Sequence, residues 1–443
     1  MEKGILIKNG VIITMDSPNK VLHGYALHIL DDKINRIAPQ AEFSAKYEHE
    51  IDANCNVVLP GMINAHMHFY STLIRGLGKA YPSRDFVEIL ENLWWRLDRK
   101  LELEDTYYSA LIMLIQAIRN GTTTLIDHHA SPGHIPGSLD EIERAVKQTG
   151  LRSSLCYELS DRDGINITEE GLAENVRFIQ KCQKEPNDYL KAMFGLHASF
   201  TIGDDTMERA VDLAKKYNTG FHVHTAEAES DQIHTMTHHG KRVVERFHDV
   251  GVLGPNTICA HCVHVNEHEI ELLKDTDTIA VHNPQSNMNN AVGIADIVTL
   301  QQKGILVGLG TDAMTVNMLE EIRVAMWAQH LKHANPSEGF MEVVNTLFNN
   351  NSKIVERFWG KKIGVLKEGA LADVILIPYC PPTPLNDETA YGHLVFGISQ
   401  GAVDTTIVGG KILMQHRILR INIDEAEVNA RSREVAQRLW DRF

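Results

Sequence analysis

The chain has 443 residues, and its 43 lysines and arginines against 58 aspartates and glutamates give a formal net charge of −15 at pH 7. This length suits a large barrel with an accessory domain. The acidic balance and the lack of a Lys/Arg cluster argue against nucleic acid as a partner. No apolar run approaches a membrane span, and the amino terminus lacks the core of a signal peptide. We therefore expect a cytoplasmic protein with no membrane partner.

The two ends of the chain have the pattern of short β-strands separated by turns. Residues 1–58 contain four such runs, and after residue 364 three more appear before a final helix over 424–443. We predict that 1–58 and 365–443 together form one small β-sandwich domain, which leaves 59–364 as a separate unit. The predicted strands are Gly4–Lys8, Val11–Met15, Ala26–Leu30, Lys33–Ile37, Gly369–Ile377, Thr405–Val408 and Lys411–Met414.

Between residues 59 and 364, short apolar runs alternate with longer helical stretches such as 103–120 and 205–217. This alternation is typical of βα units that build a parallel sheet in an α/β fold. Eight runs read as strands, which is the number that closes a (β/α)₈ barrel. They are Val57–Ile63, Thr123–Asp127, Arg152–Tyr157, Lys191–Leu196, Gly220–His224, Thr257–His261, Thr278–His282 and Leu306–Leu309.

The first predicted barrel strand leads into His66 and His68, two imidazoles set two residues apart. Side chains of a strand alternate between its faces, so both rings point the same way and can chelate a divalent metal. A His-x-His pair is as common in strands that merely pack or hydrogen-bond. The metal interpretation is favoured because six further strands end in or beside His or Asp residues, at the edge where barrel enzymes carry their reactive groups.

The fifth strand adds His222 and His224, with Glu227 three residues further on. His224 suits a metal ligand, whereas His222, one layer deeper, is interpreted as a buried packing residue. Glu227 is close enough to act as an acid or base on a metal-activated water. Asp312 ends the eighth strand in Gly-Thr-Asp, where it can bind the metal and accept a proton; a helix cap is the alternative interpretation.

Five more histidines fit this edge of the barrel less specifically. His261 can polarise the attacked atom or orient the water, although a structural hydrogen bond explains it equally well. His197 and His282 are interpreted as pocket-lining residues. What His282 does there stays open, as do the roles of His128 and His264.

Together these motifs resemble those of the amidohydrolase superfamily over nearly the full chain. They are Pro-Gly-x-x-Asn-x-His-x-His, Gly-Thr-Thr-Thr, His-x-x-Glu, Ala-His-Cys-Val-His, His-Asn-Pro-x-Ser-Asn and Gly-Thr-Asp. The resemblance is greatest to the branch of guanine, adenosine and methylthioadenosine deaminases and triazine hydrolases, and within it to the aminohydrolases called SsnA. It implies a distorted (β/α)₈ barrel, a catalytic role for Glu227 and His261, and substrate contact by His197. The metal ligands that it implies are His66, His68, His224 and Asp312.

Binuclear members of that superfamily bridge two metals with a modified lysine at the end of the fourth strand. Here His197 occupies that place and Lys191 lies at the strand's other end, so we expect a mononuclear site. Zinc is the default metal for such ligands, with Fe(II) as the alternative. Two positions depart from the family pattern: Gln116 stands where many relatives carry Glu, and Ala313 where they often have Gly or Ser.

The resemblance implies hydrolytic deamination of an amino-substituted N-heterocycle, purine-like and guanine-type among the options. In this reaction Asp312 and His261 deprotonate and aim the water, and Glu227 protonates the ring. One alternative is hydrolysis of another C–N or C–Cl bond, as in a triazine or a cyclic amide; another is a non-catalytic scaffold. Glu227 favours an amine, because a halide leaves without protonation. We further expect a homodimer or higher homo-oligomer, with specificity set by loops 70–96 and 130–138.

Overall fold

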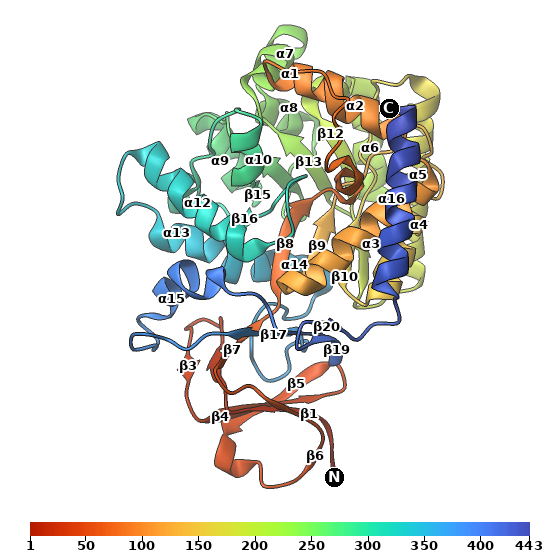
Figure 1. Cartoon of the computed structure of the whole chain (residues 1–443). Coiled ribbons are helices and arrows are strands. Elements are labelled where there is room, and N and C mark those ends of the chain that lie inside the picture. The colour runs from red at the N-terminus through yellow and green to blue at the C-terminus, as the bar shows by residue number, and fades with distance from the viewer.

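The structure, a computed structural model that describes residues 1–443, arranges the strands in four sheets (Figure 1). Two parallel sheets come from the middle of the chain, and two further sheets come from its ends and lie below them in this view. No helix combines the length and the apolar character needed to cross a bilayer.

The two parallel sheets have the strand orders β11-β10-β9-β8 and β12-β13-β14-β15-β16. Their residues are almost all buried on both faces of the sheets. This explains why these strands appear in the sequence as continuous apolar runs and not as alternating apolar and polar residues. Single bridges connect the sheets at both sides, Leu159 with Leu196 and Met67 with Asp312. The strands are β8 (Met62–Met67), β9 (Thr122–Asp127), β10 (Arg152–Leu155), β11 (Leu190–Ala192), β12 (Phe194–Ala198), β13 (Phe221–Thr225), β14 (Ile258–His261), β15 (Ile279–His282) and β16 (Val307–Leu309).

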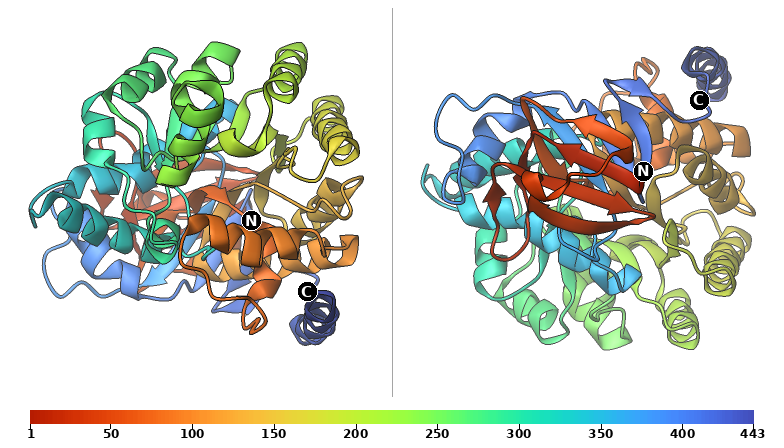
Figure 2. Two further views of the ribbon diagram at one scale, coloured as in Figure 1. Left: turned by 90° about the horizontal axis from the view of Figure 1, so that it is seen from above. Right: turned by 90° about the horizontal axis from the view of Figure 1, so that it is seen from below.

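Helices surround these strands when the molecule is seen from above (Figure 2, left). A large cluster of buried apolar side chains fills the space between strands and helices. The first long helix illustrates the local signals, since it begins at a capping box of Glu102 and Asp105 and ends at Gly121, whose φ is 71°. The helices are α3 (Leu103–Asn120), α4 (Ser138–Thr149), α5 (Ile165–Lys184), α6 (Asp204–Lys216), α7 (Glu229–His239), α8 (Val243–Val250), α9 (Glu267–Asp275), α10 (Pro284–Asn289), α11 (Ile297–Gln302), α12 (Met318–His333), α13 (Phe340–Asn345) and α14 (Asn351–Trp359).

Strands β8 and β16 are held together by side chains as well as by backbone. The carbonyl oxygen of His66 accepts hydrogen bonds from Thr311 N at 2.9 Å and Asp312 N at 3.0 Å. The buried Asn351 amide donates to the carbonyl oxygens of Ile63 and Leu309, at 2.8 and 2.9 Å. These contacts fix the register between the two strands.

Both ends of the chain contribute to one seven-stranded sheet, in which β17 pairs antiparallel with β7. A second sheet of four strands, β5-β4-β1-β6, lies beside it (Figure 2, right), and a separate apolar cluster packs between them. The strands of the two sheets are β1 (Glu2–Lys8), β2 (Val11–Ile13), β3 (Val21–Leu22), β4 (Tyr25–Leu30), β5 (Lys33–Pro39), β6 (Tyr47–Asp52), β7 (Asn56–Pro60), β17 (Val374–Pro378), β18 (Thr405–Val408), β19 (Lys411–Gln415) and β20 (Ile418–Leu419).

A covering segment lies across the carboxyl ends of the parallel strands. It consists of η2 (Phe69–Ile74), α1 (Phe86–Ile89), the π-helical turn η3 (Leu90–Trp94) and α2 (Trp95–Asp98). The C-terminal helix α16 (Glu425–Arg442) packs beside α3 and the covering segment, and Trp440 Nε1 donates to the Leu73 carbonyl oxygen at 2.8 Å (Figure 1). The remaining helix, α15 (Ala390–Phe396), follows β17.

Three predicted strands differ clearly in extent from the observed ones. The run 57–63 is not one strand, because β7 ends at Pro60 in the terminal sheet and β8 begins at Met62 in the parallel sheet. Gly61 makes this passage, and a Cβ there would lie 2.2 Å from Thr123 Oγ1. The run 191–196 is likewise divided at Met193, where the chain changes from pairing with β10 to pairing with β13. At the C-terminal end the predicted run 369–377 is a strand only from Val374 onward, where β17 (Val374–Pro378) begins.

A buried ion pair joins the parallel strands to the terminal sheets. Arg152 of β10 donates from Nε and NH2 to the two carboxylate oxygens of Asp373, at 2.7 and 3.0 Å, and both side chains are fully buried. Gly409 N also donates to Asp373 Oδ1, at 2.9 Å. The pair therefore ties β10 to the turn between β18 and β19.

We predict that Asp373→Ala lowers the free energy of unfolding by about 3 to 5 kcal/mol, because it leaves the Arg152 guanidinium buried without its counter-ion. Urea denaturation followed by circular dichroism measures the change. Glu169→Ala is the matched control, since its pair with Arg209 is about half exposed and exposed pairs contribute about 0 to 1 kcal/mol. Equal losses in the two variants would contradict the prediction.

Candidate active site

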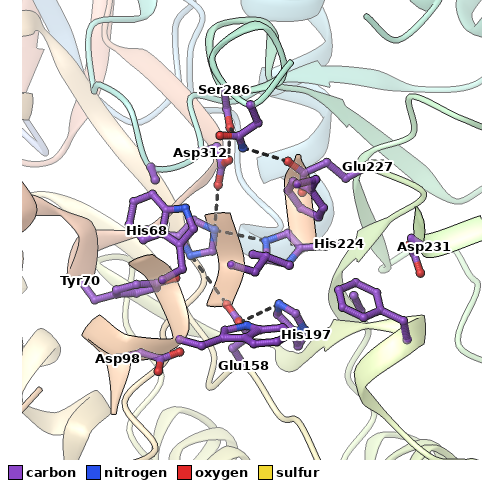
Figure 3. Close-up of a pocket in the computed structure, with 18 of the residues that line it drawn as sticks. His68, Tyr70, Asp98, Glu158, His197, His224, Glu227, Asp231, Ser286 and Asp312 are labelled. Carbon is purple, nitrogen blue, oxygen red and sulfur yellow. Dashed lines mark hydrogen bonds and ion pairs between the residues drawn. The ribbon is translucent and has the colours of Figure 1, made fainter. Parts of the chain in front are cut away.

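A pocket opens at the carboxyl ends of the parallel strands, under the covering segment (Figure 3). Its walls combine titratable groups at the strand ends with aromatic side chains from the covering segment. The residues that line it include His68, Tyr70, Phe86, Trp94, Trp95, Asp98, Glu158, His197, Phe200, His224, Glu227, Ser286, Asn290, Asp312 and Ala313.

Four side-chain atoms converge beside this pocket. His68 Nε2 lies 2.8 Å from Asp312 Oδ1 and 3.2 Å from His224 Nε2, and His66 Nε2 lies 3.3 Å from the same Asp312 oxygen. His66 Nε2 is buried and has no hydrogen-bond partner within the chain. Two ligand atoms on a tetrahedral zinc ion, each about 2.05 Å from it, are about 3.3 Å apart. This cluster therefore fits the donor set of one divalent cation.

The other nitrogen of each ring on β8 has its own partner. His66 Nδ1 shares a hydrogen bond of 2.8 Å with His222 Nε2, and His68 Nδ1 donates to the carbonyl oxygen of His128 at 2.5 Å. Donation from Nδ1 leaves a lone pair on His68 Nε2, which faces the carboxylate. His222, predicted as a buried packing residue, is buried as expected and also hydrogen-bonds His66, the kind of contact that orients imidazoles in metal sites.

Glu227 and His261 face each other at the edge of this cluster. Glu227 Oε2 lies 3.4 Å from His261 Nε2, and Glu227 Oε1 accepts a hydrogen bond from Asn290 Nδ2 at 3.3 Å. Burial, reinforced by the charge of Asp312, raises the pKa of Glu227 well above its ordinary value, and burial lowers the pKa of His261 to about 3. Both shifts favour the uncharged forms of the two facing groups.

The backbone is strained where the strands deliver these side chains. His261 and Asp312 have φ values of 76° and 53°, and Ala226, which precedes Glu227, has 48°. Non-glycine residues occupy this left-handed region rarely and at a cost of about 1 to 3 kcal/mol each. Gly310 is needed for a different reason: a Cβ there would lie 2.7 Å from the His66 carbonyl oxygen and 2.5 Å from Asn283 Oδ1.

Glu158, which sequence reasoning did not identify, lies on the opposite side of the pocket from Glu227 (Figure 3). Its Oε1 is 3.5 Å from His197 Nε2, and its Oε2 is 3.3 Å from His128 Nδ1. Burial raises the pKa of Glu158 to about 8. It follows β10 in the segment Tyr157-Glu158-Leu159, and a lone acid after a strand was the only signal available.

The covering segment closes the pocket with aromatic rings and one further acid. Trp95 packs edge-on to His197 with ring centroids 6.3 Å apart, and His197 Nδ1 forms a 2.6 Å hydrogen bond with Thr201 Oγ1. Asp98 pairs with Arg162 through one carboxylate oxygen, while its Oδ1 is buried without a partner. The predicted loop 70–96 therefore lines the pocket, whereas the predicted loop 130–138 contributes no lining residue.

The remaining predicted histidines lie outside the pocket wall. His282 is buried but does not line the pocket, and His264 Nε2 hydrogen-bonds the Val292 carbonyl oxygen at 2.7 Å. His128 is buried among other imidazoles, with no hydrogen-bond partner at either nitrogen. Gln116 accepts a hydrogen bond from Arg75 NH1 at 2.7 Å on α3 and does not line the pocket.

Comparison with known proteins shows the family of this chain. The profile described as the amidohydrolase family matches residues 57–413. The chain belongs to the amidohydrolase family. It is 32% identical over 442 residues to a 5'-deoxyadenosine deaminase of Methanosarcina mazei, with 98% of each chain covered.

Two solved structures share the fold of this amidohydrolase. An adenosine deaminase from Xanthomonas campestris with bound zinc superposes with a TM-score of 0.88 at 21% identity, covering 99% of each chain. An atrazine chlorohydrolase from Arthrobacter aurescens TC1, complexed with zinc, has a TM-score of 0.83 at 21% identity, covering 98% of this chain and 100% of the other.

These findings confirm the family predicted from the motifs. The protein is a hydrolase that acts on carbon–nitrogen bonds, a deaminase of an amino-substituted N-heterocycle, with a His/Asp group for a divalent metal. A guanine-type preference gains no support, because the sequence relative is named for an adenosine-type nucleoside.

We predict that Gly310→Ala weakens zinc binding at least tenfold, because the added Cβ must displace the His66 backbone or the Asn283 side chain. Competition with a chromophoric chelator measures the affinity. Gly392→Ala is the control, since a Cβ there meets nothing within 4 Å. Unchanged zinc affinity in a folded Gly310→Ala variant would show that the site tolerates the shift.

Proposed function

We propose that this amidohydrolase is a mononuclear, zinc-dependent aminohydrolase that converts adenine-type nucleosides into their 6-oxo products with release of ammonia. The observation that carries the proposal is the convergence of His66, His68, His224 and Asp312 beside Glu227. An acid and a cation site at the wall of a pocket, with the buried imidazole of His261 beside the acid, are the groups that addition of water to an aromatic ring carbon needs.

One ion fits the donor atoms better than two. A second group of possible ligands, His68, His128, Glu158 and His224, contains two histidines of the proposed set, His68 and His224. One imidazole nitrogen binds one metal, so a second ion would have only His128 and Glu158 to itself. Zinc is favoured by the nitrogen and carboxylate donors, with Fe(II) as the alternative.

The chain's own residues carry the proton transfers. A divalent cation bound here supplies a Lewis acid that makes water nucleophilic near neutral pH. Asp312 accepts a proton from the attacking water, and His261 orients it. Glu227, protonated because it is buried, gives its proton to the ring nitrogen next to the attacked carbon. The bond to the exocyclic nitrogen then breaks, and the amine leaves as ammonia with the proton that Asp312 took up. The remaining hydroxyl proton passes to Glu227, which restores the acid and leaves the 6-oxo product.

The far side of the pocket supports a nucleoside in preference to a free base. Aromatic rings of the covering segment, among them Trp95 and Phe86, offer faces for a planar heterocycle. Asp98 Oδ1 and Glu158 Oε2 are buried carboxyl oxygens without a hydrogen-bond partner, which suits polar groups such as hydroxyls on the substrate. The Methanosarcina mazei relative is named for 5'-deoxyadenosine, a molecule of this kind.

The strand pairing also supports a proposal for the domain organisation of the chain. We propose that the two parallel sheets form a distorted (β/α)₈ barrel over 59–364, which the bridges Leu159–Leu196 and Met67–Asp312 support. The segments 1–58 and 365–443 would then make the β-sandwich and the C-terminal helix, as the pairing of β7 with β17 suggests.

A panel of substrates tests the proposed function. The zinc-loaded protein is mixed with 5'-deoxyadenosine, adenosine, adenine, guanine and a chlorotriazine, and ammonia or chloride release is measured. We expect ammonia from the two nucleosides. Chloride release without ammonia would favour the chlorohydrolase alternative, and ammonia from guanine alone would overturn the nucleoside assignment.

We predict that Glu227→Gln lowers kcat by about 10² to 10⁴, because an amide cannot pass on the proton that the ring must receive. Steady-state kinetics with the preferred nucleoside measures this, together with zinc content, which should be unchanged. Glu229→Gln, two residues further on and exposed, is the control. Near-normal turnover by Glu227→Gln would remove this residue from the mechanism.

We predict that His197→Ala raises KM or lowers kcat/KM without changing the zinc content, because the ring faces the pocket and is not among the converging ligands. Loss of one buried hydrogen bond corresponds to about 1 to 3 kcal/mol. Kinetics and elemental analysis are compared with those of His49→Ala, a change on the terminal sheet. If zinc content fell together with activity, His197 would be a ligand.

A further inference from the structure

The short helix α10 carries none of the reacting groups named above, yet its side chains reach three of them. Asn283, Ser286, Asn287 and Asn290 lie in or next to this helix and point inward, and the first three are fully buried. Residues four apart on a helix share a face. Ser286 and Asn290 therefore form one row, and Asn283 and Asn287 form the next.

The first row contacts both catalytic carboxyl groups (Figure 3). Ser286 Oγ donates to Asp312 Oδ2, which leaves Oδ1 facing His66 and His68. Asn290 Nδ2 donates to Glu227 Oε1 at 3.3 Å and to Ser286 Oγ at 3.4 Å. Each carboxyl group thus has one oxygen bound by α10 and the other directed at the reaction centre.

The second row contacts the catalytic imidazole. Asn287 Nδ2 lies 2.9 Å from His261 Nδ1, and Asn283 Nδ2 lies 3.5 Å from the same atom. A donor at Nδ1 requires a lone pair there, so the single proton of the neutral ring sits on Nε2. Nε2 is the atom that faces Glu227 Oε2 at 3.4 Å.

The helix is itself anchored from behind. Gln285 N donates to Oε1 of Glu321 at 3.0 Å, and this glutamate of α12 is completely buried. Pro284 in the first turn has no N–H that would need a partner. The hydrogen bond to Glu321 of α12 therefore fixes the position of α10 relative to the carboxyl ends of the strands.

We infer that α10 is a positioning element: Ser286, Asn287 and Asn290 set the orientation of Asp312, the tautomer of His261 and the orientation of Glu227. None of these three residues transfers a proton or binds the metal itself. The inference rests on the proposed function and deepens it, because it assigns one supporting contact to each reacting group.

The three contacts predict three different phenotypes. Ser286→Ala should weaken zinc binding about 10- to 100-fold, because it frees Asp312 to turn, and Ser286→Thr should restore most of it. Asn290→Ala should lower kcat about tenfold or more, with KM within twofold of normal and zinc affinity unchanged. Zinc affinity is measured by chelator competition and does not depend on turnover.

The Asn287→Asp variant distinguishes a role of Asn287 in positioning His261 from a role in packing alone. Aspartate has nearly the same shape but only accepts hydrogen bonds, so it draws the His261 proton to Nδ1 and away from Nε2. We expect kcat to fall at least as far in Asn287→Asp as in Asn287→Ala, with the thermal midpoint of Asn287→Asp no lower than that of Asn287→Ala. A better kcat in the aspartate variant would indicate a packing role and overturn the tautomer assignment.

Met288→Ala is the matched control on the same helix, because this side chain is exposed and touches none of the three groups. It should keep normal zinc affinity and kcat. If Met288→Ala lost as much as the inward variants, α10 would act only through its stability. Failure of the wild type to release ammonia from any substrate would refute the proposed function, while the zinc affinities of Ser286→Ala and Ser286→Thr would still decide the role of Ser286.

Discussion

The pairing of β8 with the segment that follows β16 is the constraint on which the site depends. His66 projects from β8 and His68 directly follows it, and the carbonyl oxygen of His66 receives two backbone hydrogen bonds from Thr311 and Asp312. A one-residue slip of this pairing would turn both imidazoles to the opposite face, because strand side chains alternate. The Asn351 side chain on α14 also fixes the register between β8 and β16, through its hydrogen bonds to both strands. A helix that takes no part in the chemistry therefore helps to determine which side-chain atoms of the site lie together.

The strand ends that carry chemistry were predictable because two simple regularities coincide there. Apolar runs that alternate with helical stretches mark parallel strands, and the polar residue that ends such a run must lie at the carboxyl edge. His66, His68, His224, Glu227, His261 and Asp312 all follow this pattern, and the structure brings them together. Gly61 was the weak point, since residues 57–63 were predicted as one strand although Gly61 separates strands of two different sheets.

The groups that the sequence did not reveal are those whose partners come from distant segments. Glu158 reads as an ordinary acid after a strand, and only folding brings it beside His128 and His197. Ser286 and Asn290 look like a polar helix surface, and nothing local indicates that both face buried carboxyl groups. Side-chain direction on a six-residue helix depends on where neighbouring elements place its axis, and that is a tertiary property.

The pairing of strands from both chain ends in one sheet affects the order in which the protein folds during its synthesis on the ribosome. β7 at residues 56–60 pairs with β17 at residues 374–378, so more than three hundred residues must be synthesised between the two partners. At about 5 to 20 residues per second, β7 waits roughly 15 to 60 s with one edge unpaired. During this time the nascent chain exposes the apolar run Val57-Val58-Leu59, a sequence suited to binding by a chaperone or by another unfinished chain.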